Sequence, residues 1–237
     1  MDTNYDERNK SQIIRVDAKN CFVESRSDAF EIGKAHLEFA TYDTNKPKGE
    51  RQTNNVHIYL DMPEFLCLAN EALNSMLHTR ARHQRTNNIK EPLYESLGGT
   101  SADKLKQRGN PRPDGKSLSR IFKIVLGNKD DYYLFVADSG PGEADAKGLI
   151  VPKFGNTPEN HVAVSMNWRA VNELMVMTKV HYEAWLAAKY MVEYGGNYKT
   201  PLNPQKNPVQ QTASADNNGN QSGNIGDAIE TDDLPII

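Results

Sequence analysis

The chain has 237 residues, of which 38% are hydrophobic and 25% charged, as in globular proteins with one large domain or two small ones. No segment approaches the ~20 consecutive apolar residues of a membrane-spanning helix, and residues 1–15 have no apolar signal-peptide core. The two cysteines, Cys21 and Cys67, are too few for a disulfide framework. These features argue against a membrane partner and favour a cytoplasmic location.

The net charge of -3 conceals a segregation of charge along the chain. Residues 80–123 contain eleven basic and four acidic residues, whereas the segment from Leu202 onward contains one basic and five acidic residues. A basic middle followed by an acidic end is a specific asymmetry. The basic part predicts an affinity for phosphate groups.

Strands followed by a helix are predicted for the first part of the chain, after residues 1–10, which we expect to be disordered. Apolar and β-branched runs predict strands at residues 13–16, 21–24, 31–42 and 56–60. Residues 45–55 are predicted to form a polar loop. Asp61 is the predicted cap of a helix that has Pro63 in its first turn and an apolar stripe reaching Met76.

The predicted strand at residues 31–42 alternates in period two, as a half-buried strand does. Its expected core-facing residues are Ala35, Leu37 and Phe39. Its expected solvent-facing residues are Lys34, His36 and Glu38.

Residues 86–116 are rich in basic residues, Gly and Pro, but their apolar residues show little periodicity. They are therefore predicted to form a long, exposed basic insertion. Strands are predicted to resume at residues 119–126, 132–137, 148–154 and 161–166. Residues 138–143 are Gly-rich and predict a turn between strands. Asn167 is the predicted cap of a second, longer helix that reaches about Tyr194.

The two predicted strand-to-helix junctions resemble each other. With a shift of 106 residues, Val56 aligns with Val162 and the cap Asp61 with the cap Asn167. An internal duplication with halves at about residues 11–85 and 117–198 explains this likeness. The alternative explanation is that any amphipathic strand followed by a capped helix gives a similar sequence pattern. Both explanations stay open.

The end of the chain has a different composition. Residues 199–226 are dominated by Pro, Asn, Gln, Gly, Ser and Ala, which predicts a flexible linker. Residues 227–237 form an acidic tip with apolar residues at its end. Such a tip suits a tethered peptide ligand whose apolar residues fill a small pocket on a partner protein.

This tail resembles that of bacterial single-stranded-DNA-binding (SSB) proteins and of functionally similar phage proteins. Their chains end in a Gly/Gln/Asn/Pro-rich linker and a tip of the type Asp-Asp-(Ile/Leu)-Pro-Phe. The match is Asp232, Asp233, Leu234 and Pro235, followed by Ile236 and Ile237 where the family has a terminal Phe. The resemblance implies that these six residues recruit replication or recombination proteins. A merely solubilising acidic tail is the alternative.

The body of the chain is weakly similar to another family. Residues 32–37, Ile-Gly-Lys-Ala-His-Leu, are similar to the strand motif Lys-Gly-Lys-Ala-Ala-Leu of the Whirly family. That resemblance implies an α+β fold in which two antiparallel-sheet-plus-helix halves form a pseudo-dimer that binds single-stranded DNA. The basic insertion and the SSB-like tail depart from the usual Whirly layout, and an oligonucleotide/oligosaccharide-binding (OB-fold) barrel is the alternative fold.

Binding a single strand requires cations for the phosphates and aromatic faces for the unpaired bases. The predicted DNA-binding residues are Lys34, Arg80, Arg82, Arg85, Lys104, Lys106, Arg108, Arg112, Lys116, Arg120, Phe122, Lys123 and Tyr133. Trp168 and Trp185 are expected to be packing residues of the second helix. Homo-oligomerisation is left open.

The sequence has no phosphate-binding loop, zinc-ligand spacing or nucleophile elbow, so we expect neither an enzyme, nor a cofactor, nor a bound metal. The prediction is a largely sequence-independent single-stranded-DNA-binding protein of a replication, recombination or transfer system, such as that of a phage or mobile element. Two alternatives are an adaptor that acts only through its tail and, less favoured, a metal-dependent nuclease built on carboxylates such as Asp43, Asp61 and Asp138.

Overall fold

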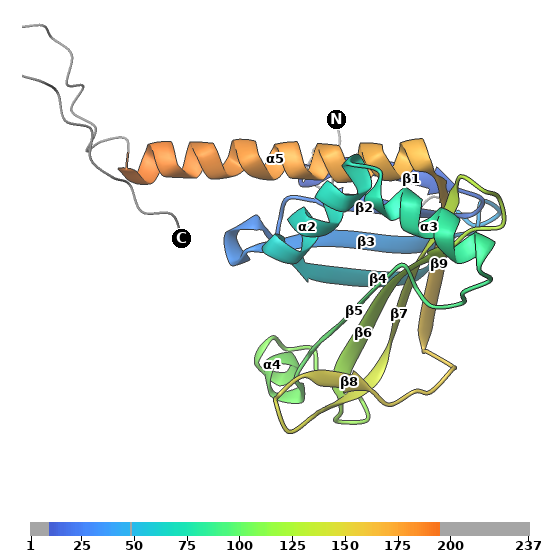
Figure 1. The fold of residues 1–237 in the computed structure, drawn as a ribbon. Coiled ribbons are helices and arrows are strands. Elements are labelled where there is room, and N and C mark those ends of the chain that lie inside the picture. The colour runs from blue at the N-terminus through green and yellow to red at the C-terminus, as the bar shows by residue number, and fades with distance from the viewer. Residues whose placement is uncertain (1–9, 48, 195–237) are drawn as a thin grey trace, which may run out of the picture. The chain divides into compact units, whose positions relative to one another are not determined.

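The computed structural model describes residues 10–47 and 49–194, which contain two antiparallel β-sheets and four α-helices (Figure 1). The first half comprises β1 (Gln12–Ala18), β2 (Cys21–Arg26), the 3-10 helix η1 (Phe30–Ile32), β3 (Lys34–Tyr42), β4 (Gln52–Asp61), α2 (Met62–Leu73) and α3 (Met76–Thr86). The second half comprises β5 (Tyr94–Thr100), α4 (Ala102–Gln107), β6 (Ser117–Leu126), β7 (Tyr132–Ala144), β8 (Ile150–Pro152), β9 (Asn160–Asn167) and α5 (Trp168–Tyr194). The predicted α+β class with two antiparallel sheets is confirmed.

Each half contains a run of four antiparallel strands whose last strand leads directly into a helix. The first sheet has the order β1-β2-β3-β4. In the second sheet β5, β6 and β7 are neighbours, and both β9 and the short β8 pair with β7, at different ends of that long strand. The two junctions aligned in the sequence, β4 to α2 and β9 to α5, therefore occupy equivalent places in the topology.

The two predicted helix caps differ in what their side chains do. The Asn167 Oδ1 accepts a hydrogen bond from the Ala170 N–H at 2.8 Å, as a capping side chain does. Asp61 occupies the cap position of α2, but its carboxylate forms no cap hydrogen bond and instead pairs with the Lys34 Nζ at 2.5 Å. The helix after Asp61 is also interrupted, because Ser75 adopts a left-handed conformation and separates α2 from α3.

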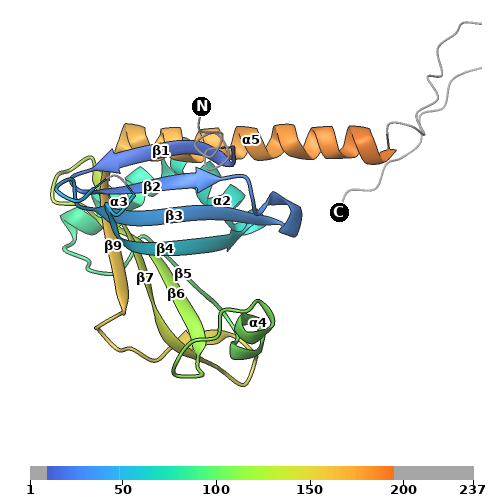
Figure 2. The ribbon, with the colours of Figure 1, turned by 180° about the vertical axis from the view of Figure 1, so that it is seen from behind.

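One hydrophobic core joins the two halves. Phe39 of β3 and Phe122 of β6 are fully buried, with ring centroids 5.7 Å apart. The helix α5 of the second half packs on the first sheet, where the Thr178 Oγ1 donates to the Ser25 Oγ at 2.7 Å. Burying a phenylalanine side chain contributes about 1.5–3 kcal/mol, so this shared core fixes the two sheets in one domain. Figure 2 shows that α2, α3 and α5 lie behind the first sheet and leave its other face without a helix in the described chain.

The sequence predicts a structureless insertion at residues 86–116, and this prediction is wrong. It contains β5, which pairs with β6, and the helix α4. The two central glycines of β5 hide its alternation in the sequence, because glycine is depleted in strands. Gly99 has a packing reason, since a Cβ there would lie 2.5 Å from the Leu118 carbonyl oxygen.

Residues 138–143 were also predicted wrongly, because they lie inside β7 instead of forming a turn. A Cβ on Gly140 would lie 2.7 Å from the Phe154 ring, and one on Gly142 would lie 2.7 Å from the Ser119 Cβ. These glycines therefore serve close packing. β4 likewise begins at Gln52, within the loop predicted for residues 45–55. The other predicted strands correspond to β1, β2, β3, β6, β8 and β9.

Candidate nucleic-acid interface

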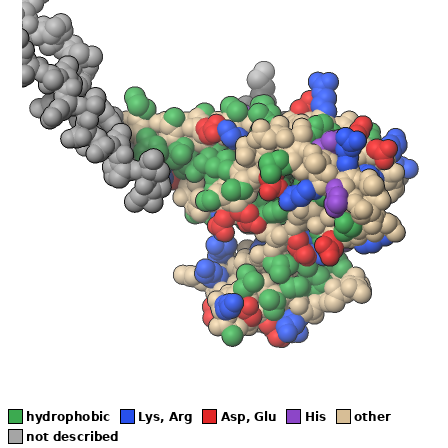
Figure 3. Space-filling view, in the orientation of Figure 1, with side chains coloured by type: hydrophobic (Ala, Val, Ile, Leu, Met, Phe, Trp, Pro, Cys, Tyr) green, Lys and Arg blue, Asp and Glu red, His purple; other side chains and the backbone are tan. Residues whose placement is uncertain are grey.

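A cleft of about 680 Å³ separates the first sheet from the second. One wall is formed by η1, β3, β4 and the start of α2, and the other by β5, α4, β6 and the segment that enters β8. Figure 3 shows this hollow, with Lys and Arg side chains gathered at its left end and acidic side chains along its upper side. The cleft brings together segments that are far apart in the sequence.

The basic residues of the lining are Lys34, Lys104, Arg108 and Arg120. Lys34 is paired with Asp61 at 2.5 Å. For the other three, no carboxylate of the described residues lies within ion-pair distance. The lining therefore contains three cations that lack a carboxylate partner within residues 10–47 and 49–194.

The acidic residues of the lining all have partners. Asp61 holds Lys34, and the Asp28 carboxylate accepts from the His36 Nδ1 at 2.7 Å. The Glu64 carboxylate accepts a hydrogen bond from the hydroxyl of Tyr94. The acids are thus engaged with protein groups, which leaves the cations of α4 and β6 available to an anionic ligand.

Arg120 occupies the floor of the cleft. It lies on the same strand as the core residue Phe122 and opposite Gly98 of β5, which has no side chain. Within the described residues its side chain donates one hydrogen bond, from Nη1 to the Thr100 Oγ1 at 2.9 Å. Burial lowers the pKa of Arg120, Tyr59 offsets part of this effect, and the nearby Arg108 lowers the pKa further, but a guanidinium stays charged. A largely buried charge without a counter-charge is costly, so this position favours binding of an anion.

Tyr59 supplies an aromatic face that the sequence analysis missed. Its side chain is 41% exposed, and its ring stacks on His36 with the centroids 4.4 Å apart and the planes 18° from parallel. The guanidinium carbon of Arg120 lies 5.7 Å from the Tyr59 centroid. The alternation of β4 contains the signal, because Val56, Ile58 and Leu60 face the core and place Tyr59 on the opposite face.

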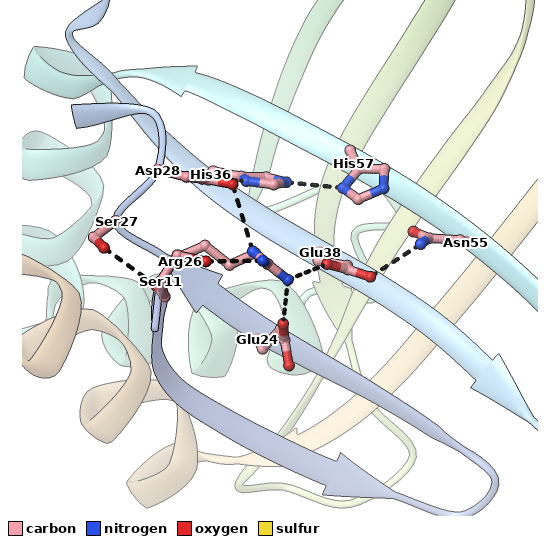
Figure 4. A network of polar contacts seen from close by, with 9 residues as sticks. All are labelled: Ser11, Glu24, Arg26, Ser27, Asp28, His36, Glu38, Asn55 and His57. Carbon is pink, nitrogen blue, oxygen red and sulfur yellow. Dashed lines mark hydrogen bonds and ion pairs between the residues drawn. The ribbon is translucent and has the colours of Figure 1, made fainter. Parts of the chain in front are cut away.

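His36, on which the Tyr59 ring stacks, belongs to a polar network of the first sheet (Figure 4). His36 Nε2 lies 2.9 Å from His57 Nδ1, and the other His36 nitrogen is held by Asp28. Burial lowers the pKa of His36 and of His57. The solvent exposure predicted for His36 and Glu38 is wrong, since both are buried by their neighbours on the first sheet.

The same network contains an arginine between carboxylates. Arg26 Nη1 donates to Glu24 at 3.0 Å and to Glu38 at 2.9 Å. Burial raises the pKa of Glu24, and the neighbouring charge of Glu38 raises it further. Asn55 donates to the second oxygen of Glu38 at 2.9 Å. The Arg26 charge is thus compensated by carboxylates of its own sheet, although Arg26 Nε and Asn55 Oδ1 are buried without a hydrogen-bond partner in the described part of the chain.

Two predicted stacking residues are core residues. Phe122 and Tyr133 are 0% exposed, because their strand faces point into the shared core. The Tyr133 hydroxyl pairs with the His78 Nδ1 at 2.8 Å, and burial raises the pKa of Tyr133 to about 12. The prediction that these rings contact DNA is therefore wrong. Trp168 and Trp185 pack against the core, as predicted.

Several predicted phosphate contacts are engaged in the fold. Arg85 donates to the carbonyl oxygens of Gly127, Lys129 and Tyr132 at 3.1, 2.7 and 3.0 Å, and so joins α3 to the turn between β6 and β7. Arg112 forms ion pairs with Asp114 and Glu159, Arg80 with Glu71, and Lys123 with Glu95. All three nitrogens of Arg112 and both terminal nitrogens of Arg85 are engaged by these partners, which argues against a phosphate-binding role for either residue.

The remaining predicted cations, Arg82, Lys106 and Lys116, are exposed and do not line the cleft. The basic segment of the sequence is thus distributed over several places, and only Lys104, Arg108 and Arg120 meet at the cleft, joined by Lys34 from the first half. The predicted partner-binding residues, Asp232, Asp233, Leu234, Pro235, Ile236 and Ile237, lie outside the described residues, as does the predicted linker.

The carboxylates considered for a nuclease have local roles. Asp61 pairs with Lys34, Asp138 with the His161 Nδ1 at 2.6 Å, and the Asp43 carboxylate accepts from the Asn45 N–H. Within residues 10–47 and 49–194, no three His, Cys, Asp or Glu side chains are grouped as a metal site would need. No helix in that same part of the chain is long and apolar enough to span a membrane.

Comparison with known proteins gives no further identification. No protein-family model matches the chain, and no curated protein matches it.

Proposed function

We propose that this chain binds single-stranded DNA in the cleft between its two sheets, with little sequence preference. The observation that carries the proposal is the group formed by Lys104, Arg108 and Arg120. These three cations have no carboxylate partner in the described part of the chain, and they line the same cleft as the exposed ring of Tyr59. Cations next to an aromatic face are the combination by which proteins bind single strands. Phosphates supply the missing counter-charge, and an unpaired base covers the ring.

Apolar residues on the walls support a single strand over a duplex. Ile32, Leu97 and Leu149 line the cleft and are 68%, 40% and 44% exposed. Exposed apolar side chains favour contact with the faces of nucleobases. A single strand presents these faces, whereas in a duplex they are stacked on one another. Each base stacked on an aromatic side chain contributes roughly 1–3 kcal/mol.

The topology supports a finer assignment of the fold. Two runs of four antiparallel strands, each leading into a helix, are the arrangement that the Whirly resemblance implies. We therefore favour a Whirly-like pseudo-dimer over an OB-fold barrel. The acidic tip at residues 227–237 is proposed to recruit replication or recombination proteins, on the sequence grounds given above.

The test is a titration of the full-length chain with fluorescent oligonucleotides, single-stranded and duplex, at two salt concentrations. Three phosphate contacts predict a slope of about -2 for log K against log salt on a single strand, or roughly a twentyfold loss between 50 and 200 mM. Arg120→Gln should lower both the affinity and this slope. Arg82→Gln is the matched control, because it removes the same charge from α3 outside the cleft.

Equal affinity for single strand and duplex would remove the single-strand proposal. An absence of any salt-sensitive DNA binding would favour the adaptor alternative, in which the tail alone acts. Cleavage of a labelled single strand in the presence of magnesium would instead favour a nuclease.

A further inference from the structure

We infer that Tyr59 and Arg120 hold one unpaired nucleobase between them, so that the cleft takes a nucleotide by its base as well as by its phosphate. This inference rests on the proposed function and specifies its central contact. It follows from the spacing of these two side chains, from their backing, and from the empty floor beside them.

The spacing shows that Tyr59 and Arg120 are near each other without being in direct stacking contact. Elsewhere on the first sheet, the Arg15 guanidinium lies 3.6 Å from the Phe22 centroid, which is close contact. The corresponding distance from Arg120 to Tyr59 is 5.7 Å. Two groups that sandwich a base lie roughly 7 Å apart, because carbon atoms in contact are about 3.5 Å apart. Arg120 has to move by only about 1 Å to admit a base.

The two groups differ in mobility in a way that suits this role. Tyr59 is an edge-strand residue whose ring is stacked on the buried His36, and His36 is itself fixed by Asp28 and His57. Arg120 is held by one hydrogen bond from the described residues, to the Thr100 hydroxyl. The tyrosine therefore provides a fixed platform, and the arginine provides the adjustable side, since guanidinium groups stack well on planar rings.

Gly98 leaves space on the floor of the cleft beside Arg120. It is the cross-strand partner of Arg120, and a Cβ built on it meets no atom within 4 Å. A side chain would therefore fit the strand but fill the space next to the guanidinium. Lys104 and Arg108, exposed on and just after α4, supply charge for the flanking phosphates.

The experiment uses the full-length chain and an oligothymidine of about ten nucleotides, a length within the usual site size. A single central 2-aminopurine reports stacking of that base by loss of its fluorescence. A second oligonucleotide carries an abasic residue at the same position. The variants are Tyr59→Leu, Tyr59→Phe and Gly98→Leu, with Arg82→Gln as the control outside the cleft.

We expect Tyr59→Leu to weaken binding roughly 5- to 150-fold, which is the loss of one base–aromatic stack. Tyr59→Phe should keep both the affinity and the fluorescence quenching, because it keeps the ring. Gly98→Leu should abolish the quenching while thermal unfolding remains as in the unaltered chain. The abasic strand should bind the unaltered chain as weakly as the intact strand binds Tyr59→Leu.

The inference is overturned if Tyr59→Leu and the abasic strand bind like their unaltered counterparts while Arg120→Gln still weakens salt-dependent binding. That result would leave the proposed function standing, with the strand held by its phosphates alone. If the unaltered chain fails to bind single strands at low salt, the proposed function itself is wrong.

Discussion

Two arginines, one on each sheet, have the same chemistry and opposite surroundings. Arg26 of β2 lies between Glu24, Glu38 and Asp28, with nitrogen–oxygen distances of 3.0, 2.9 and 3.5 Å. Arg120 of β6 has no carboxylate within ion-pair distance among the described residues and faces the cleft. One charge is compensated inside the protein, and the other is left for a ligand.

The pKa values follow this difference. Burial by itself lowers the pKa of Arg26, but Glu38, Glu24 and Asp28 outweigh burial and raise it. Burial lowers the pKa of Arg120, and no carboxylate opposes it. A charged side chain whose surroundings favour the ionised form, such as Arg26, stabilises the fold. A charged side chain whose surroundings oppose the ionised form, such as Arg120, is a candidate for ligand binding.

The largest expected effect is on the compensated arginine. Arg26→Met removes the cation that is hydrogen-bonded to both Glu24 and Glu38, two nearly buried carboxylates that repel each other. We expect the free energy of unfolding in urea to fall by roughly 3 kcal/mol. Arg120→Met removes an uncompensated charge, so it should leave stability unchanged or raise it. A loss at Arg120 as large as that at Arg26 would contradict the comparison.

A smaller effect is expected in binding. Arg120→Met should weaken the binding of a single strand about tenfold, which corresponds to ~1.4 kcal/mol, as measured by fluorescence anisotropy. Arg82→Met should leave the affinity within about twofold, because a solvated surface charge contributes little. Equal losses for both variants would show that total charge, and not the cleft, governs binding.

The histidines beside Arg26 predict a dependence of stability on pH. The pKa values of His36 and His57 are lowered by burial, so the unfolded chain binds protons more readily than the folded chain below about pH 6.5. Their contribution to stability is therefore complete above pH 6.5 and is lost as the pH falls from there towards their folded values. Thermal unfolding from pH 8 downward should show this fall, and His57→Gln should make it shallower. Glu24, whose pKa is raised, acts in the opposite direction at lower pH.

The smallest effect concerns the exposed pair of Lys34 and Asp61. Asp61→Asn should change the free energy of unfolding by less than ~1 kcal/mol, as for most surface pairs. It also removes an acid from the cleft and frees Lys34, so single-strand affinity should rise about two- to threefold at low salt, and the gain should fade at high salt. Weaker binding by Asp61→Asn would indicate that Asp61 contacts the ligand.

The sequence predicts part of the site and misses part of it for identifiable reasons. The high number of basic residues in one segment predicted Lys104, Arg108 and Arg120, and the cleft brings these three together. The same feature also suggested Arg85 and Arg112, whose partners come from other segments of the chain. Tyr59 was missed although its place in the alternation of β4 predicts that it faces away from the core.

The amino-acid sequence by itself determined the local elements: the core alternation of Ala35, Leu37 and Phe39, the Asn167 cap, and the α+β succession of strands and helices. These features depend on residues close together in the chain, where periodicity and capping act. Only the tertiary structure decided which basic side chains have no carboxylate partner among the described residues, and which aromatic side chain lies beside them. Charge compensation and burial depend on neighbours in space, and Tyr59 and Arg120, which lie near each other in the cleft, come from opposite halves of the chain.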